Sequence, residues 1–308
     1  MLTIAFCTFK RADRLENLVA TLRAQSCPEP FEILAVNNNS PDNTLEILTR
    51  LQQQPGAPLR VVTETKQGIV HARNRAIEET MGCEIMVFID DDELPMQGFL
   101  ATAYDAIMSE EAECVGGPVK VCFSPHQRPR WLEDNLLGFL AEVNYGKEAF
   151  WVKDNATPIW TCNVAYRTDL FKDGLRFDPR YNRCGDGVGG GEDVMMFQAL
   201  LQRGTKIRYR PDMLVEHFVE AWRLKRAYFL RLHYVSGLKH GYHEFPSYPR
   251  EIFGVPVFLL TQLMRHTAKT VLMYSSGQSG SLRQAMNMTH AFGMIAGCFA
   301  RWRGAKGP

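Results

Sequence analysis

Three consecutive aspartates are the residues of this sequence best suited to chemistry. Asp90, Asp91 and Asp92 directly follow Ile85–Ile89, an apolar run typical of a strand buried on both faces. Adjacent carboxylates repel one another, and a bound cation relieves that repulsion. Carboxylate oxygens suit Mg²⁺ or Mn²⁺, which commonly keep coordination positions open for substrate phosphates. The alternative is an acidic helix start, which the helix dipole favours.

A second acidic pair opens an apolar segment further along the chain. Glu192 and Asp193 follow three glycines, and Glu192–Gln202 has the periodicity of a helix. An acid held in the first helical turn could take a proton from an attacking hydroxyl group. Capping of the helix N-terminus is the alternative reading. The glycine run lacks the spacing and the preceding strand of a dinucleotide-binding motif.

Two single residues depend on the fold for their meaning. His217 follows a strand-like segment, where a histidine is more often structural than a metal ligand, unless the fold brings it to the aspartates. Arg73 and its neighbour Asn74 lie in Ile69–Thr80, which is predicted to be helical. Arginine suits a bidentate phosphate contact, although on an exposed helix it would be a solvated charge.

The elements that must position these residues alternate between strand and helix. This order predicts an open, mostly parallel sheet between helices, which is an α/β fold. Ligands bind such sheets at the carboxyl ends of the strands, and a polar loop follows each predicted strand here. The predicted strands are Leu2–Cys7, Phe31–Val36, Leu59–Val62 and Ile85–Ile89. The loops after them start at Thr8, Asn37, Glu64 and Asp90.

Composition indicates a folded globular chain. The 308 residues are 45% hydrophobic and 22% charged, which is enough to build a full core. The eight cysteines include no C-x-x-C pair, so zinc-finger and thioredoxin-like readings fail and a reducing compartment is expected. The N-terminus lacks signal-peptide features, and Arg265, His266 and Lys269 interrupt the best candidate for a membrane span.

Charge divides the chain unevenly. Residues 221–308 contain eight arginines and four lysines but two glutamates, a net charge of +10, whereas residues 1–220 have a net charge of −9. The basic segment combines amphipathic helical patterns with aromatic residues, which favours the surface of an anionic bilayer. Helices packed on the rest of the protein are the alternative. No fingerprint of nucleic-acid binding is present, so no nucleic-acid partner is expected.

Taken together, the motifs resemble family 2 glycosyltransferases, which have the GT-A fold. The resemblance extends over residues 1 to about 220, and its order and spacing are more specific than any one motif. It rests on Thr8, Arg11, Val36–Thr44, Gly68–Asn74, Phe88–Asp92, Asn163–Tyr166, Phe177–Asp178, Gly191–Asp193 and His217.

This resemblance implies that residues 1–220 form a GT-A catalytic domain that binds a nucleotide sugar, and the charge and amphipathic patterns predict a helical extension at 221–308. It implies that Asp193 is the catalytic base and that Asp92, His217 and Asp90 hold Mn²⁺ or Mg²⁺. The residues implied to bind the donor are Thr8, Arg11, Asn37, Asn39, Asp42, Arg73, Asn74, Asp90 and Asp91. Those implied to line the sugar or acceptor pocket are Trp160, Asn163 and Glu192.

The expected activity is inverting transfer of a sugar from a nucleoside diphosphate to a hydroxyl group of a saccharide or lipid-linked acceptor. Cell-surface polysaccharide or glycoconjugate synthesis is the expected setting, at the cytoplasmic face of the membrane. Many relatives have Asp where this chain has Asn37, so UDP is favoured but the nucleobase stays open. Two alternatives remain, a non-catalytic carbohydrate- or membrane-binding module of the same fold and a nucleotidyltransferase.

Overall fold

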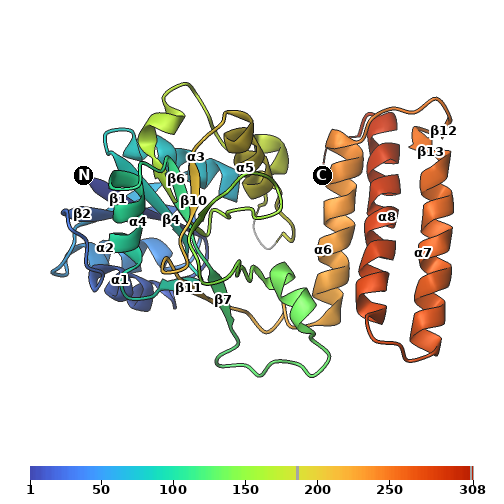
Figure 1. Cartoon of the computed structure of the whole chain (residues 1–308), viewed down its shortest axis with the longest axis horizontal. Coiled ribbons are helices and arrows are strands. Elements are labelled where there is room, and N and C mark those ends of the chain that lie inside the picture. Colours follow the sequence, from blue (N-terminus) through green and yellow to red (C-terminus); the bar gives the residue numbers. More distant parts are fainter. Residues whose placement is uncertain (185–186, 306, 308) are drawn as a thin grey trace. The chain divides into compact units, whose positions relative to one another are not determined.

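The computed structural model describes residues 1–184, 187–305 and 307. Contacts within the chain divide it into two compact units. Unit 1 consists of Met1–Gln127, Leu137–Gly185 and Glu192–Val219. Unit 2 consists of Arg128–Leu136, Asp186–Gly191 and Glu220–Pro308. Figure 1 shows the strands of the large sheet in the first unit and three long helices in the second.

Unit 1 is built on an eight-stranded sheet. The first four strands in spatial order run parallel, and β9 then lies antiparallel to both of its neighbours, β4 and β6. The four predicted strands are therefore confirmed, and the sheet continues through four further strands. In spatial order the strands are β3 Leu59–Thr63, β2 Phe31–Asn37, β1 Leu2–Thr8, β4 Ile85–Asp90, β9 Asn163–Arg167, β6 Cys114–Gly116, β10 Ile207–Tyr209 and β8 Phe150–Trp151.

Helices cover both faces of this sheet because its strands are apolar on both sides. Along β1, Ile4 and Phe6 point into the core under three helices, while Ala5 faces the core under two others. The first three helices are α1 Leu15–Arg23, α2 Thr44–Gln52 and α4 Phe99–Met108. The opposite pair are α3 Ile69–Thr80 and α5 Glu192–Gln202, which begin and end where the periodicity predicts.

A small second sheet in unit 1 completes the edge where the aspartates lie. Its central strand β11 pairs antiparallel with β5 and parallel with β7. The register sets His217 opposite Glu93, two segments that are far apart in the sequence. The three strands are β5 Glu93–Pro95, β11 Val215–Phe218 and β7 Val119–Cys122. Short helices η2 Thr168–Phe171 and η3 Pro179–Tyr181 lie in connections of unit 1, whereas η1 Asp134–Leu140 begins in unit 2 and ends in unit 1.

Unit 2 is helical, as its amphipathic patterns predict. Its long helices are α6 Arg226–Lys239, α7 Val257–Ser275 and α8 Ser281–Trp302, and α6 continues into a π-helical turn, η4 His240–Glu244. A hairpin of β12 Glu251–Ile252 and β13 Val255–Pro256 leads directly into α7. No helix in the described ranges combines the length and the apolar character needed to cross a bilayer.

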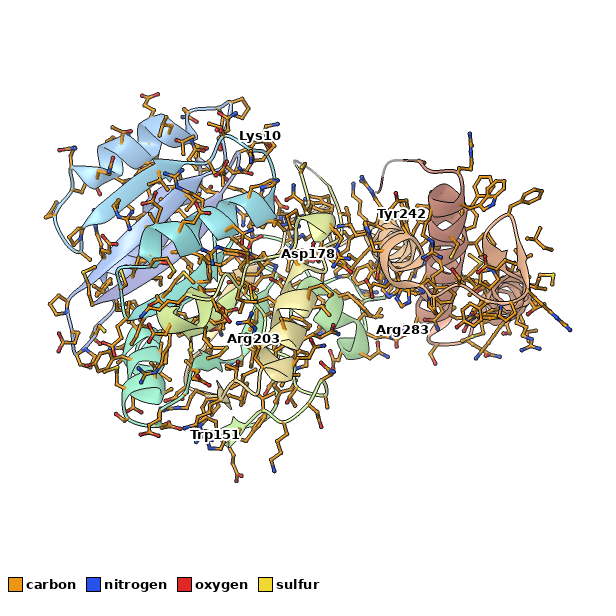
Figure 2. The ribbon with its side chains drawn as sticks, turned by 90° about the horizontal axis from the view of Figure 1, so that it is seen from above. Lys10, Trp151, Asp178, Arg203, Tyr242 and Arg283 are labelled. Atoms are coloured by element: carbon orange, nitrogen blue, oxygen red, sulfur yellow. The ribbon has the colours of Figure 1, made fainter. Side chains whose placement is uncertain are left out.

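Close packing between α6 and α8 depends on glycines in both helices. A Cβ added at Gly237 would lie 2.1 Å from the carbonyl oxygen of His290, and one at Gly293 would lie 2.1 Å from that of Tyr234. Such a short approach excludes any side chain at these positions. Figure 2, viewed from above, shows the side chains of this unit, with Tyr242 and Arg283 labelled.

Candidate active site

The predicted cluster of acids lies at the carboxyl end of β4. Asp92 is 8% exposed, and its Oδ1 atom lies 3.3 Å from Nδ1 of His217. The buried Glu93 approaches the same imidazole nitrogen, with Oε1 at 3.7 Å from Nδ1, and it accepts a hydrogen bond from the backbone N–H of Asp90. The fold therefore brings His217 to the aspartates, which was the condition for a role in metal binding.

These buried acids lack enough positive charge. Burial and then the charge of Asp92 raise the pKa of Asp91 to about 7, against the opposing effect of Arg11, whose Nε lies 3.9 Å from Oδ1 of Asp91. Burial, together with Asp90 and Asp92, also raises the pKa of Glu93 well above its ordinary value. Oδ2 of Asp91 is buried with no hydrogen-bond partner. A cation at this edge would relieve both the repulsion and the unmet acceptor.

The residues fit a divalent cation with two protein ligands. Within the described ranges, no set of three or more His, Cys, Asp or Glu side chains is arranged to hold a metal. Mg²⁺, however, is commonly held by one or two carboxylates together with substrate phosphates rather than by a complete protein cage. Asp92 and His217 lie close enough together to supply such a partial set, and Asp90 is the last residue of β4, two positions before Asp92.

Arg73 connects this edge to the second acidic pair. Its guanidinium is 3% exposed and binds three carboxylates: Oδ1 of Asp90 at 3.1 Å, Oε1 of Glu192 at 3.1 Å and Oδ1 of Asp193 at 2.6 Å. Burial alone would lower the pKa of Arg73, but Asp193, Asp90 and Glu192 hold it well above the ordinary value. The structure thus places Arg73 inside an ion network, and its predicted contact with a diphosphate stays a prediction.

The two acids at the start of α5 have different environments. Glu192 is 4% exposed, and burial raises its pKa, with Asp193 adding to the rise and Arg73 opposing it. Its second carboxylate oxygen is buried with no hydrogen-bond partner. The side chain of Asp193 is 26% exposed. Of the two, Asp193 therefore offers the carboxylate that an acceptor could reach.

The asparagine-rich loop after β2 is held in shape by its own amides. Buried Asn38 donates to the carbonyl groups of Glu64 and Lys66 and accepts a 2.7 Å hydrogen bond from the N–H of Gly68. It therefore fixes two neighbouring loops. Sequence reasoning did not single it out, although it lies between two residues that were chosen. No local pattern shows which of the three asparagines reaches across to the neighbouring loop.

The other donor-site predictions around this loop are placed as follows. Thr8 and Asn37 pair in register at the ends of β1 and β2, and both are 2% exposed. Asn37 accepts a hydrogen bond from the N–H of Ser40 at 3.1 Å, so its carbonyl oxygen supports the turn. Asn39 is exposed with a φ of 53°, and exposed Asp42 accepts two hydrogen bonds from Thr44 at the start of α2. Lys10 follows β1 in the adjacent loop (Figure 2).

Two predicted site residues bind backbone groups of the fold. Asn74 donates to the carbonyl oxygen of Phe177 at 3.0 Å and accepts from its N–H at 2.8 Å. Asn163 is 1% exposed and donates to the carbonyl oxygens of Pro118 and Met213. Trp160 is half-buried against the core. Ligand contacts of these three residues stay predictions, because their observed contacts are with the protein itself.

Comparison with known proteins points to one family. A family model described as Glycosyl transferase family 2 matches residues 3–175. An uncharacterized glycosyltransferase, YfnE of Bacillus subtilis (strain 168), is 33% identical over 111 residues, which is 35% of this chain and 27% of YfnE. Glycosyltransferase AglE of Haloferax volcanii is 28% identical over 37% of this chain and 38% of AglE. The matched segment therefore spans well under half of either relative.

Solved structures share the fold over nearly the whole chain. The mannosyltransferase PcManGT of Pyrobaculum calidifontis, in complex with GDP-Man and Mn²⁺, superposes with a TM-score of 0.59 at 17% identity over 99% of this chain and 88% of that one. TarS 1–349 of S. aureus, in complex with UDP-GlcNAc, gives 0.57 at 15% identity over 99% and 92% of the two chains. This likeness confirms the expected GT-A architecture with helices at the C-terminal end.

Proposed function

Because the chain belongs to glycosyl transferase family 2, we propose that it transfers a sugar from a nucleoside diphosphate to an acceptor hydroxyl group with inversion at the anomeric carbon. The observation that carries this proposal is the buried Arg73, which binds Asp90 and Asp193 at once. One guanidinium thereby holds the end of the cation-binding edge and the carboxylate suited to proton transfer within a single network.

The donor side is assigned to the strand edge of unit 1. Asp92 and His217 would hold Mn²⁺ or Mg²⁺, with Asp90 beside them, and the cation would neutralise charge on the departing diphosphate. The loops after β1 and β2 would receive the nucleoside. We favour a UDP sugar, and the comparison structures containing UDP-GlcNAc and GDP-Man with Mn²⁺ support a nucleotide sugar as the donor class.

The acceptor side is assigned to Asp193. Arg73 holds Oδ1 of this carboxylate at 2.6 Å, which fixes its orientation while the side chain remains 26% exposed. Asp193 would remove the proton from the acceptor hydroxyl as its oxygen bonds to the anomeric carbon. The bond from that carbon to the diphosphate oxygen breaks in the same step, and its electron pair leaves with the diphosphate. Glu192 would support this geometry from within the core.

The distribution of charge along the chain supports a role for each of its two parts. We propose residues 1–220 as the catalytic domain and 221–308 as an extension for the acceptor or the membrane. The acceptor would be a saccharide or a lipid-linked saccharide used in cell-surface polysaccharide or glycoconjugate synthesis. The net charge of +10 over residues 221–308 supports work at the cytoplasmic face of the membrane, where anionic lipids are present.

Calorimetric binding of UDP, GDP and dTDP, each with and without Mn²⁺, tests the donor site. We expect one nucleotide to bind with Mn²⁺, and Asp92→Asn to weaken that binding by removing one ligand charge. Asp169→Asn is the matched control, because the Asp169 side chain is 74% exposed and pairs only with a surface lysine among the contacts described. If folded wild-type protein bound none of the three nucleotides, the proposed function would be wrong.

A further inference from the structure

Exposed apolar side chains are concentrated in unit 2. Of the 19 large hydrophobic side chains exposed in the described ranges, 11 lie between residues 252 and 302. Where exposed apolar side chains form a continuous patch on a soluble protein, the patch usually marks a binding surface. The eleven are Ile252, Phe253, Val257, Phe258, Met264, Val271, Leu272, Tyr274, Phe292, Phe299 and Trp302.

Helix α7 carries the central part of this surface. Leu259 and Thr270 are its buried residues, and on its outward side Met264, Val271 and Leu272 are 64%, 64% and 63% exposed. Spacings of seven and eight residues set these three side chains on one stripe of the helix. The buried side of α7 packs against the protein, so its exposed apolar stripe would be stabilised by a second apolar surface outside the protein.

Aromatic rings form a cluster next to the start of α7. Phe253, in the hairpin that leads into the helix, packs on Trp302 with ring centroids 5.3 Å apart, and Phe299 stacks on the same indole at 5.8 Å. Phe253 and Trp302 are 63% and 55% exposed. The guanidinium of Arg303 lies 5.7 Å from the ring centroid of Phe299. Aromatic and basic groups in this combination suit the headgroup level of a bilayer.

Charge identifies the occupant. Residues 252–308 contain no Asp or Glu, and exposed Arg265 and Lys269 lie along one side of the α7 stripe. A second copy docked through the same face would bring like charges together. A nucleic acid would complement the charge but would leave the aliphatic side chains of α7 without a partner. An anionic lipid surface complements both features. The basic residues of this segment are Arg265, Lys269, Arg283, Arg301, Arg303 and Lys306.

We propose that the outward face of α7, together with the aromatic cluster of Phe253, Phe299 and Trp302, docks on an anionic lipid bilayer. Met264, Val271 and Leu272 enter the boundary between headgroups and acyl chains, with the helix lying parallel to the surface. Arg265 and Lys269 meet the lipid phosphates. This docking needs neither donor nor turnover, so it does not rest on the proposed transfer reaction.

Flotation of the full chain with lipid vesicles tests the apolar stripe. We expect binding to phosphatidylcholine vesicles that contain phosphatidylglycerol, and much weaker binding to pure phosphatidylcholine. Leu272→Glu should lower the partition coefficient about tenfold or more, since it removes a buried aliphatic side chain from the lipid. Leu45→Glu is the matched control, an exposed leucine on α2 of unit 1, and should bind as the wild type does.

Charge removal gives an independent second arm. Arg265→Gln and Lys269→Gln should each weaken binding about fivefold, because a basic residue near an anionic surface contributes roughly 1 kcal/mol. Lys172→Gln, an exposed lysine of unit 1, should have no effect. Added salt should reduce wild-type binding and narrow the difference between wild type and these variants.

Several outcomes would overturn the proposal. They are absence of wild-type flotation on anionic vesicles, equal flotation of Leu272→Glu, a dimer in sedimentation that Leu272→Glu disperses, or retention of RNA in preference to vesicles. Circular dichroism establishes that each variant is folded. Nucleotide binding measured on the same samples separates the two proposals, since docking without nucleotide binding would count against the transferase and leave the lipid surface intact.

Discussion

The two units gather charge in opposite ways. In unit 1, consecutive acids gather at the carboxyl end of β4, and burial together with the charge of Asp92 raises the pKa of Asp91 to about 7. In unit 2, bases spread along exposed helices, and no acid occurs between residues 252 and 308. A sheet edge aims side chains at one location, whereas a helix distributes them over a face.

This difference determines what each charge can do. Carboxylates that are buried together repel one another, and a bound cation removes that repulsion. The free energy of cation binding therefore comes from a few contacts. Exposed basic side chains are solvated and repel one another only weakly. Each of them would therefore contribute a small amount to binding at the helical face, and salt would screen that contribution. Unit 1 therefore has the character of a ligand site, and unit 2 that of a docking surface.

Asp193→Asn should have the largest effect, and that effect should fall on the rate of sugar transfer and not on nucleotide binding. The substitution removes the proton acceptor but keeps the shape of the side chain, so transfer should slow by about 10²- to 10⁴-fold. Nucleotide affinity should change little. Steady-state turnover with the donor found by calorimetry gives the measurement, and turnover at the wild-type rate would remove Asp193 from the role of base.

Arg73→Gln should have the next largest effect, on folding as well as on activity. The change leaves Glu192 buried without its cation, and breaking a buried ion network costs about 3–5 kcal/mol. Urea unfolding gives the free energy directly. The matched control is Arg75→Gln on the same helix, whose side chain is 35% exposed and pairs with Glu79, and which should cost under about 1 kcal/mol.

Gly237→Ala tests the packing of α6 against α8 in unit 2, again by urea unfolding. The new methyl group would meet the carbonyl oxygen of His290 at 2.1 Å, so α6 must move away from α8. We expect a loss of about 1–3 kcal/mol, partly offset by the better helix propensity of alanine. Gly82→Ala, with no atom within 4 Å of the new group, is the control and should be close to neutral. Equal unfolding curves would show that the helices separate freely.

Acid should weaken unit 2 by a smaller amount. Burial lowers the pKa of His233 from 6.5 to about 4, with Arg283 and His290 contributing, against the carbonyl oxygen of Phe229. Burial also lowers the pKa of His290. Both groups protonate more readily in the unfolded chain, so their contribution is complete above pH 6.5 and is lost as the pH falls towards 4.

We expect a loss of about 2 kcal/mol over this range after allowance for partial exposure. Hydrogen exchange followed peptide by peptide would localise it to α6 and α8. A His233→Asn variant should show a shallower pH dependence than the wild type. An identical pH dependence in the variant would assign the effect to other groups.

Local patterns were sufficient to predict the first half of the fold. The strands up to β4 follow from short apolar runs buried on both faces, and the bounds of α3 and α5 follow from period-3.6 apolar patterns. The region between α4 and β9 could not be predicted, since its strands are two to four residues long and its connections are 3₁₀ turns. The antiparallel entry of β9 is a long-range pairing that no local pattern encodes.

The residues of the site can be separated in the same way, into those that local sequence patterns indicate and those that only the fold brings together. The types of the acidic residues and their place after β4 were evident, and the structure brings His217 to Asp92 through the pairing of β11 with β5. The inward turn of Arg73 was not evident, because its partners Glu192 and Asp193 lie about 120 residues away. Sequence can name residues capable of chemistry, but only the packed fold shows which of them the protein uses to hold itself together.

The position of β9 in the sheet has a consequence for synthesis on the ribosome. β9 lies between β4 and β6, although β6 is made before it. During synthesis, the edge of β4 that pairs with β9 in the finished protein therefore has no partner until residues 163–167 have been made. The ion pair of Arg73 with Glu192 can form only later, after residue 192 has been made. Such nascent edges are where newly made proteins pair wrongly. The yield of this protein in a cell should thus depend on chaperone capacity during that interval.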